Sequence, residues 1–117
     1  MRVLVCGSRE WEDYYLIFNE LANLHYQGYT ELIEGGCRGA DAHAKKAAKA
    51  LGMSVITVEA EWEKYGKSAG YKRNLEMINM KPNIVLAFKR GESKGTQITI
   101  DLAKKQGIKT IIHYEYE

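Results

Sequence analysis

Five short apolar segments alternate along this chain with segments of helical periodicity, and this alternation constrains the fold more than any other feature. The apolar segments cover residues 2–6, 29–34, 54–58, 83–88 and 109–113. Between them lie helical patterns over residues 13–26, 40–51, 68–79 and 95–106. Because parallel strands need helical crossovers, the alternation predicts an α/β domain with a mostly parallel five-stranded sheet and helices on both faces.

Local signals set the ends of two helices. Asp13 is placed to cap the first helix, in which Ile17, Leu21 and Leu24 recur at core-facing spacing. Gly52 suits the end of the second helix.

Two segments lack a regular pattern. Residues 59–71 form the least regular stretch, and we predict that they make the longest loop of the domain. Trp62 and Tyr65 within it favour a role at a binding site over disorder. The acidic tail from Glu115 is predicted to be frayed.

Length and composition exclude several classes of protein. The 117 residues fit one domain spanning 1–117, and no apolar run approaches the roughly 18 residues of a membrane span. Residues 2–6 are too short for a signal peptide, so we expect a cytoplasmic protein. Cys6 and Cys37 form no metal-binding pattern, so we predict free or structural thiols, no metal and no cofactor. The net charge of +2 does not demand a nucleic-acid partner.

A glycine-rich stretch joins the second apolar segment to the second helical pattern. It has the sequence Gly35-Gly36-Cys37-Arg38-Gly39-Ala40-Asp41. Glycine lets the backbone take positive φ, and the following helix directs its positive dipole end at the same place. The stretch is therefore a candidate phosphate-binding loop, with a tight strand-to-helix turn as the alternative.

Two further motifs follow predicted strands. Gly7-Ser8-Arg9 follows the first strand, and Gly95-Thr96 opens the last helix. Thr96 either helps to bind a phosphate group or caps its own helix. Since the carboxyl ends of parallel strands share one edge of the sheet, we expect both motifs to line the same crevice as the glycine-rich stretch.

Two common nucleotide motifs are excluded. Gly66-Lys67-Ser68 resembles the end of a Walker A loop, but Glu61 stands where that motif needs glycine. The glycine-rich stretch has the spacing GGxxG instead of the dinucleotide fingerprint GxGxxG.

Three other residues are candidates for a binding site. Arg73 suits a bidentate phosphate contact and Asn74 a base or ribose, although a surface ion pair is the alternative for Arg73. Asp41 either orders the site by pairing with an arginine or complements the helix dipole.

Taken in order, these motifs resemble the SLOG superfamily, and within it the YspA-like, cpYpsA-related group. The resemblance extends from Met1 to about Lys109. It is carried by Gly7-Ser8-Arg9 with Trp11 and Asp13, Gly35-Gly36-x-x-Gly39-Ala40-Asp41, Trp62-x-x-Tyr65-Gly66-Lys67-x-Ala69-Gly70, Arg73-Asn74-x-x-Met77, Ala87-Phe88 and Gly95-Thr96. It implies a Rossmann-like sheet of order 3-2-1-4-5 that holds a nucleotide-type ligand between the three loops.

Two branches of the superfamily suggest alternatives. The LOG phosphoribohydrolases resemble this chain at Gly95-Thr96 and Arg73, but Thr99 stands where they carry a catalytic glutamate. Asp101 is a poor substitute because it lies on another side of the helix. Glu34 and Asp41 remain as candidate catalytic residues for such a hydrolase.

DNA-processing protein A has a similar site layout, which suggests single-stranded DNA as a ligand. The low net charge and the few aromatic residues available for stacking disfavour a nucleic-acid partner.

These arguments favour a nucleotide-binding protein over an enzyme. We predict a sensor or sequestering protein for ADP-ribose, a cyclic variant or a nucleoside monophosphate, with no membrane partner. A homodimer or higher homo-oligomer is expected, for which Tyr14, Tyr15 and Phe18 are candidate interface residues. The predicted ligand-binding residues are Gly7, Ser8, Arg9, Gly35, Gly36, Arg38, Gly39, Asp41, Trp62, Lys67, Arg73, Asn74, Gly95 and Thr96.

Overall fold

A five-stranded parallel sheet forms the centre of the computed structural model, which describes residues 1–116. All four strand pairings are parallel, and the order is β3-β2-β1-β4-β5. Both the parallel α/β architecture and the strand order are therefore confirmed. The strands are β1 (Arg2–Gly7), β2 (Glu31–Glu34), β3 (Ser54–Thr57), β4 (Ile84–Arg90) and β5 (Lys109–Glu115).

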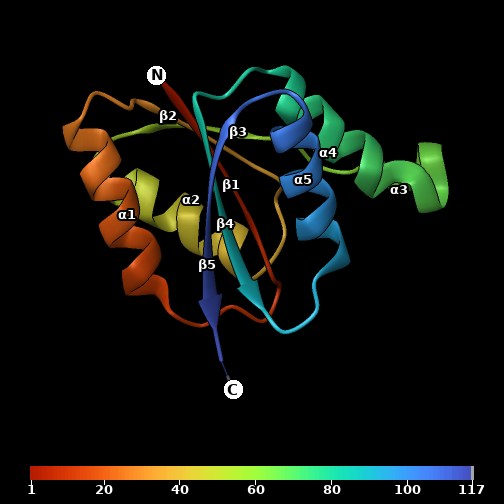
Figure 1. The fold of residues 1–117 in the computed structure, drawn as a ribbon, viewed down its shortest axis with the longest axis horizontal. Coiled ribbons are helices and arrows are strands. Elements are labelled where there is room, and N and C mark those ends of the chain that lie inside the picture. The colour runs from red at the N-terminus through yellow and green to blue at the C-terminus, as the bar shows by residue number, and fades with distance from the viewer. Residues whose placement is uncertain (117) are drawn as a thin grey trace.

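Helices cover both faces of the sheet, with α1 and α2 on one side and α4 and α5 on the other (Figure 1). No helix in the described range 1–116 is long and apolar enough to cross a membrane. The helical elements are α1 (Tyr14–Tyr26), α2 (Ala40–Leu51), α3 (Trp62–Tyr65), the 3₁₀ turn η1 (Gly66–Ser68), α4 (Ala69–Asn79) and α5 (Lys94–Lys105).

The two faces of the central strand β1 supply two separate cores. Val3 and Val5 pack toward α1 and α2, whereas Leu4 and Cys6 pack toward α4 and α5. This follows because successive side chains of a strand point to opposite faces of the sheet. Since helices cover both faces, both sets of side chains are apolar. The sheet therefore holds the loop after β1 between the two layers of helices.

The predicted helix signals are confirmed. The N–H of Leu16 donates to the Asp13 carboxylate at 3.1 Å, and Ile17, Leu21 and Leu24 are buried. Gly52 adopts the left-handed conformation at the end of α2, with φ of +79°.

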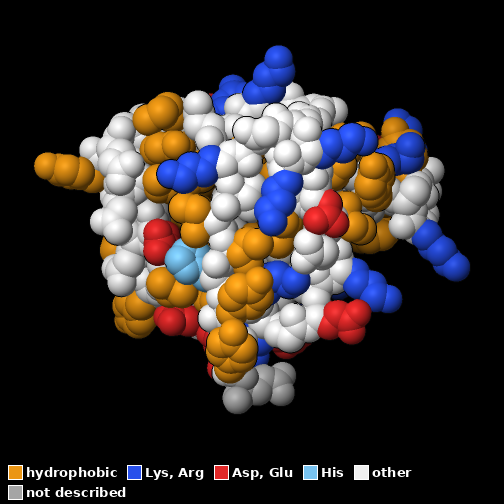
Figure 2. Space-filling view, viewed as in Figure 1, with side chains coloured by type: hydrophobic (Ala, Val, Ile, Leu, Met, Phe, Trp, Pro, Cys, Tyr) orange, Lys and Arg blue, Asp and Glu red, His pale blue; other side chains and the backbone are white. Residues whose placement is uncertain are grey.

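The prediction of a long loop over residues 59–71 is wrong, because most of this segment is helical. The N–H of Tyr65 donates to the Glu61 carbonyl at 3.0 Å, which closes the turn of α3. The 3₁₀ turn follows, and α4 begins at Ala69. Figure 1 shows α3 projecting from the body of the domain, and basic and hydrophobic side chains gather at that end in Figure 2.

The prediction of a frayed tail from Glu115 is wrong for Glu115 itself, and Glu117 lies outside the described residues. Glu115 ends β5, and its carboxylate accepts hydrogen bonds from the N–H groups of Glu12 and Asp13 at 2.9 and 2.8 Å. Burial alone would raise the pKa of Glu115, but these N–H groups and the Arg90 guanidinium hold it below its usual value. Glu115 is thus fixed by contacts from the segment between β1 and α1.

Candidate functional site

The cavity that we call the main cavity, because it lies at the strand ends, is found where the strand order reverses, at the carboxyl ends of the neighbouring strands β1 and β4. Its volume is about 330 Å³. Open parallel sheets bind ligands at this switch point, because the connections leave on opposite sides of the sheet there. The main cavity is lined by Cys6, Gly7, Ser8, Arg9, Glu10, Cys37, Asp41, Arg73, Asn74, Met77, Arg90, Glu92, Ser93, Gly95, Thr96 and Thr99. A larger hollow of about 780 Å³ lies away from these strand ends, between β3 and the helices α3 and α4.

The glycine-rich loop, residues 35–39, forms one wall and is tied down by two charged side chains. Asp41 Oδ2 accepts hydrogen bonds from the N–H groups of Gly35 and Cys37 at 3.1 and 3.3 Å. Arg73 Nη1 donates to the Gly35 carbonyl at 2.6 Å and lies 3.8 Å from Cys37 Sγ. The loop is therefore fixed from α2 through Asp41 and from α4 through Arg73.

Asp41 has an environment suited to proton exchange near neutral pH. Burial raises the pKa of this carboxyl from its usual 3.8 to about 7, and the nearby Glu34 also raises it. The N–H groups of Cys37 and Gly35 and the guanidinium of Arg73 oppose this shift without cancelling it. Asp41 therefore changes its charge close to physiological pH inside the cavity wall.

Close packing against backbone atoms requires glycine at Gly7 and Gly39, whereas a Cβ at Gly35 would meet only the end of a side chain. A Cβ atom at Gly7 would lie 2.5 Å from the Phe88 carbonyl oxygen, and one at Gly39 would lie 2.5 Å from that of Ser8. A Cβ at Gly35 would meet the Arg73 guanidinium at 2.7 Å. Gly39 also has φ of +76°, which strongly favours glycine.

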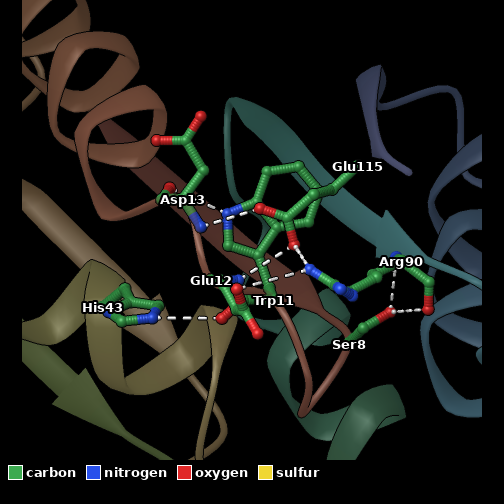
Figure 3. A network of polar contacts seen from close by, with 7 residues as sticks. All are labelled: Ser8, Trp11, Glu12, Asp13, His43, Arg90 and Glu115. Carbon is green, nitrogen blue, oxygen red and sulfur yellow. Dashed lines mark hydrogen bonds and ion pairs between the residues drawn. The ribbon is translucent and has the colours of Figure 1, made fainter. Parts of the chain in front are cut away.

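Ser8 joins the loop after β1 to the end of β4. Its hydroxyl accepts from the Arg90 N–H at 2.8 Å and lies 3.2 Å from the Arg90 carbonyl, to which it donates (Figure 3). The hydroxyl is therefore engaged with the backbone. In the same network the Arg90 side chain contacts Glu115 at 2.8 Å and Glu12 at 3.7 Å.

The start of α5 forms the opposite wall. Ser93 precedes the helix in an extended conformation and makes no side-chain capping bond to it; its hydroxyl instead lies 2.6 Å from that of Thr96. The first N–H groups of a helix have no partners within the helix. This wall therefore offers backbone donors and a positive dipole end to the cavity.

Asn74 connects the two walls. Its side-chain oxygen accepts from Arg73 Nε at 2.8 Å, and its side-chain nitrogen donates to the Gly95 carbonyl at 3.3 Å. Asn74 is buried, so these bonds hold Arg73 at a fixed orientation between the walls.

A second, smaller cavity of about 240 Å³ adjoins the main one. The two share Cys37 and Arg73, and Trp62 lines the smaller cavity with 53% of its surface exposed. An exposed indole beside a guanidinium offers a flat apolar surface for a ring.

Seven of the predicted site residues lie outside the main cavity. Glu34 is fully buried and accepts hydrogen bonds from the Gly36 N–H at 2.7 Å and from the Thr57 hydroxyl. Arg38 forms an exposed ion pair of 2.6 Å with Glu10, and Lys67 is exposed on η1. Gly36 and Trp62 line only the smaller cavity, and Gly35 does so as well. Gly39 lines neither cavity.

Several cavity residues were missed by the sequence analysis. Arg90 ends β4, the neighbour of β1, and Glu92 follows it, so their position at the end of a strand was the signal that could have identified them. Cys6 and Met77 lack such a signal, since they line the cavity from elements whose pattern indicates core packing. Thr99 did carry one, because the resemblance to the LOG phosphoribohydrolases places a catalytic glutamate at its position. Glu10, Cys37 and Ser93 complete the set. Within residues 1–116 no cluster of His, Cys, Asp or Glu could hold a metal ion.

Comparisons with known proteins agree with the resemblance carried by the motifs. The model of the YspA, cpYpsA-related SLOG family matches residues 1–65. The Gene 61 protein of Mycobacterium phage D29 is 38% identical, and the match covers 94% of each chain. No solved structure matches significantly. The chain therefore belongs to the YspA, cpYpsA-related SLOG family.

Proposed function

We propose that this protein binds a nucleotide or nucleotide-derived ligand in the main cavity and acts as a sensor or sequestering protein. The observation that carries the proposal is a cavity at the switch point of the sheet that combines Arg9, Arg73 and the start of α5. Guanidinium groups and helix N-termini are the usual protein partners of phosphate. Family membership supports a nucleotide-related function.

The sizes of the two cavities favour a ligand with two parts. About 330 Å³ lies at the small end of the range for ligand pockets, which suits a sugar phosphate better than a whole dinucleotide. The adjoining cavity at Trp62 extends the site past Arg73. A ribose phosphate in the main cavity with its base on Trp62 would use both, as AMP or the adenosine half of ADP-ribose could.

Titration calorimetry with ADP-ribose, nucleoside monophosphates and ribose 5-phosphate tests the proposal. We expect one ligand to bind per chain, and Trp62→Ala to weaken nucleotide binding about tenfold while leaving ribose 5-phosphate unchanged. Tyr71→Ala is the control, because Tyr71 is similarly exposed, at 48%, but lines neither cavity. Absence of binding across the panel at millimolar concentration would contradict the proposal.

Hydrolysis of a nucleoside phosphate is a second candidate function, favoured by Asp41. A cavity carboxyl with a pKa near 7 can exchange a proton with water or a leaving group at neutral pH. Glu34 is less suited, because its two oxygens are bonded to Gly36 and Thr57.

Chromatography of nucleoside monophosphates incubated with the protein separates the two functions. Release of the free base, lost in Asp41→Asn, would support a hydrolase. Full recovery of the intact nucleotide would leave binding as the function.

A further inference from the structure

The edge strand β5 presents an open pairing surface. It has seven residues and borders the sheet beside β4, and its other side has no partner strand within residues 1–116. In Figure 2, which has the view of Figure 1, hydrophobic side chains run down the surface over β5 with no other segment in front of it. Tyr114 and Tyr116 extend this surface with 56% and 84% of their area exposed.

The strand lacks most features that protect sheet edges from pairing. Proteins blunt open edges with proline, bulges, inserted lysines or short strands. The sequence of β5, Lys109 to Glu115, contains no proline or glycine, and its lysine stands only at the first position. The opposite edge, β3, is only four residues long. The β3 edge is therefore protected by its short length, whereas the longer β5 edge is not.

The residues of β5 are complementary to the same strand running in the opposite direction. An antiparallel pair centred on Ile112 places Lys109 opposite Glu115 of the second copy, at both ends of the pairing. Lys109 and Glu115 lie on the same face of the strand, as side-chain alternation requires for such a pair. The Glu115 carboxylate is already bonded within its own chain to the N–H groups of Glu12 and Asp13 and to Arg90, so its charge only supplements the pairing and the apolar side chains set the register.

The apolar side chains complement each other in the same register. On the α5 side, Ile112 meets its own copy and Tyr114 meets Thr110. On the α1 side, half-buried Ile111 meets His113, whose ring stacks on Phe88 at 5.3 Å. Aromatic and β-branched pairs of this kind are favourable across antiparallel strands.

The helix face suggested by sequence is a weaker candidate for the interface. Tyr14 and Phe18 are partly buried and pack against the core of the domain, which leaves Tyr15 as the exposed member of the three at 74%. One exposed tyrosine does not form a continuous surface.

We propose that two copies of this chain pair through β5 about a two-fold axis at Ile112, which joins their sheets into one. Because the strands run in opposite directions, the two cavities open at opposite ends of the dimer and both stay accessible. The proposal does not depend on which ligand the cavity holds.

Sedimentation analysis tests whether the dimer forms and where. We expect a mass twice the 13.3 kDa of one chain. Ile112→Lys places two like charges at the axis and is expected to give the monomer, with circular dichroism to verify that the variant is folded. Tyr15→Lys is the matched control on α1 and should stay dimeric. A monomeric wild type, or a dimer lost in Tyr15→Lys and kept in Ile112→Lys, would overturn the proposal.

A cross-link tests the register without depending on a disruptive variant. Residues directly opposite each other in antiparallel strands have Cα atoms about 4.5–5.5 Å apart, within the range of a disulfide. Ile112→Cys in a Cys37→Ser background should therefore form a covalent dimer on mild oxidation. Tyr26→Cys, at a site 94% exposed on α1, should form far less. Equal cross-linking at both positions would contradict the two-fold at Ile112.

Discussion

The two walls of the main cavity use their hydrogen-bonding groups differently. In the glycine-rich loop the N–H groups of Gly35 and Cys37 bond to Asp41, and the Gly35 carbonyl bonds to Arg73. Ser93 makes no side-chain cap to α5, and the first N–H groups of a helix have no partners within the helix. In the loop that resembles a phosphate cradle in sequence, the N–H groups of Gly35 and Cys37 are thus already bonded within the protein, whereas Ser93 leaves the helix start uncapped.

This difference separates glycines that the fold needs from a glycine that a ligand would need. Gly39 has a positive φ and no room for a Cβ atom. Gly95 has neither constraint, because no heavy atom lies within 4 Å of the place its Cβ would take. The substitutions below test that contrast.

Gly39→Ala is expected to have the largest effect. The added methyl would press on the Ser8 carbonyl, and alanine disfavours φ of +76°, so we expect the free energy of unfolding to fall by roughly 3–6 kcal/mol. Such a loss is comparable to the whole stability of many domains. Urea denaturation measures it. Gly52→Ala is the control, since it shares a positive φ but has open space, and should cost only about 1–2 kcal/mol. Equal losses would show that packing at Gly39 is unimportant.

Asp41 should make stability depend on pH. Its folded pKa of about 7 exceeds its usual 3.8, so the folded state binds the extra proton between these values. Its contribution to the free energy of unfolding is therefore full below pH 4, falls as the pH rises to about 7, and is constant above. We expect a fall of roughly 4 kcal/mol that is absent in Asp41→Asn.

Urea denaturation from pH 4 to pH 8 gives the difference between the wild-type and Asp41→Asn curves. Asp101→Asn serves as the control, because Asp101 is exposed on α5 and its carboxylate accepts a hydrogen bond from the Gln97 side chain. Its curve should run parallel to that of the wild type. A parallel curve for Asp41→Asn would mean that Asp41 titrates normally.

Substitutions of Arg9 and Arg38 compare the effect of a cavity arginine on nucleotide binding with that of a surface arginine. Arg9 lines the main cavity, whereas Arg38 lies outside it in an exposed pair with Glu10. On the proposed function, Arg9→Gln should weaken nucleotide binding about tenfold, which corresponds to the loss of one charge-assisted hydrogen bond. Arg38→Gln should change it less than about twofold. Equal losses in calorimetry would indicate a general effect of charge and not a contact of Arg9.

Much of the fold followed from local signals in the sequence. Apolar segments bounded by glycine predicted the strands, and Asp13 predicted the start of α1. The alternation of strands with helices predicted the parallel sheet. One error lies where contacts distant in sequence decide. Glu115 is ordered by N–H groups more than 100 residues away in the sequence, and no local sequence pattern predicts these bonds. The error over residues 59–71 has a local cause instead: Gly66, read as a loop signal, takes a positive φ at the junction of α3 and η1, and residues 62–71 are helical.

The location of the candidate site could be predicted from the sequence, but most of its hydrogen bonds could not. Strand ends located Ser8, Arg9 and Thr96 at one edge, and all three line the cavity. Sequence could not tell that the Ser8 hydroxyl is bonded to the Arg90 backbone, since that pairing depends on the register of β1 against β4. The same holds for Glu34, whose burial against β3 removes it from the cavity wall.

Gly95→Ala is the smallest expected effect on stability and the sharpest test of the contrast between the walls. Gly95 stands in the first turn of α5 without a positive φ, so alanine should raise the free energy of unfolding by about 0.5–1 kcal/mol. The new methyl would nevertheless stand where a phosphate approaches the first N–H groups, so nucleotide affinity should fall severalfold. Urea denaturation and calorimetry on the same preparation measure the two effects. If affinity is unchanged while stability rises, the phosphate does not bind at this helix start, and Gly95 is dispensable for binding as well as for folding.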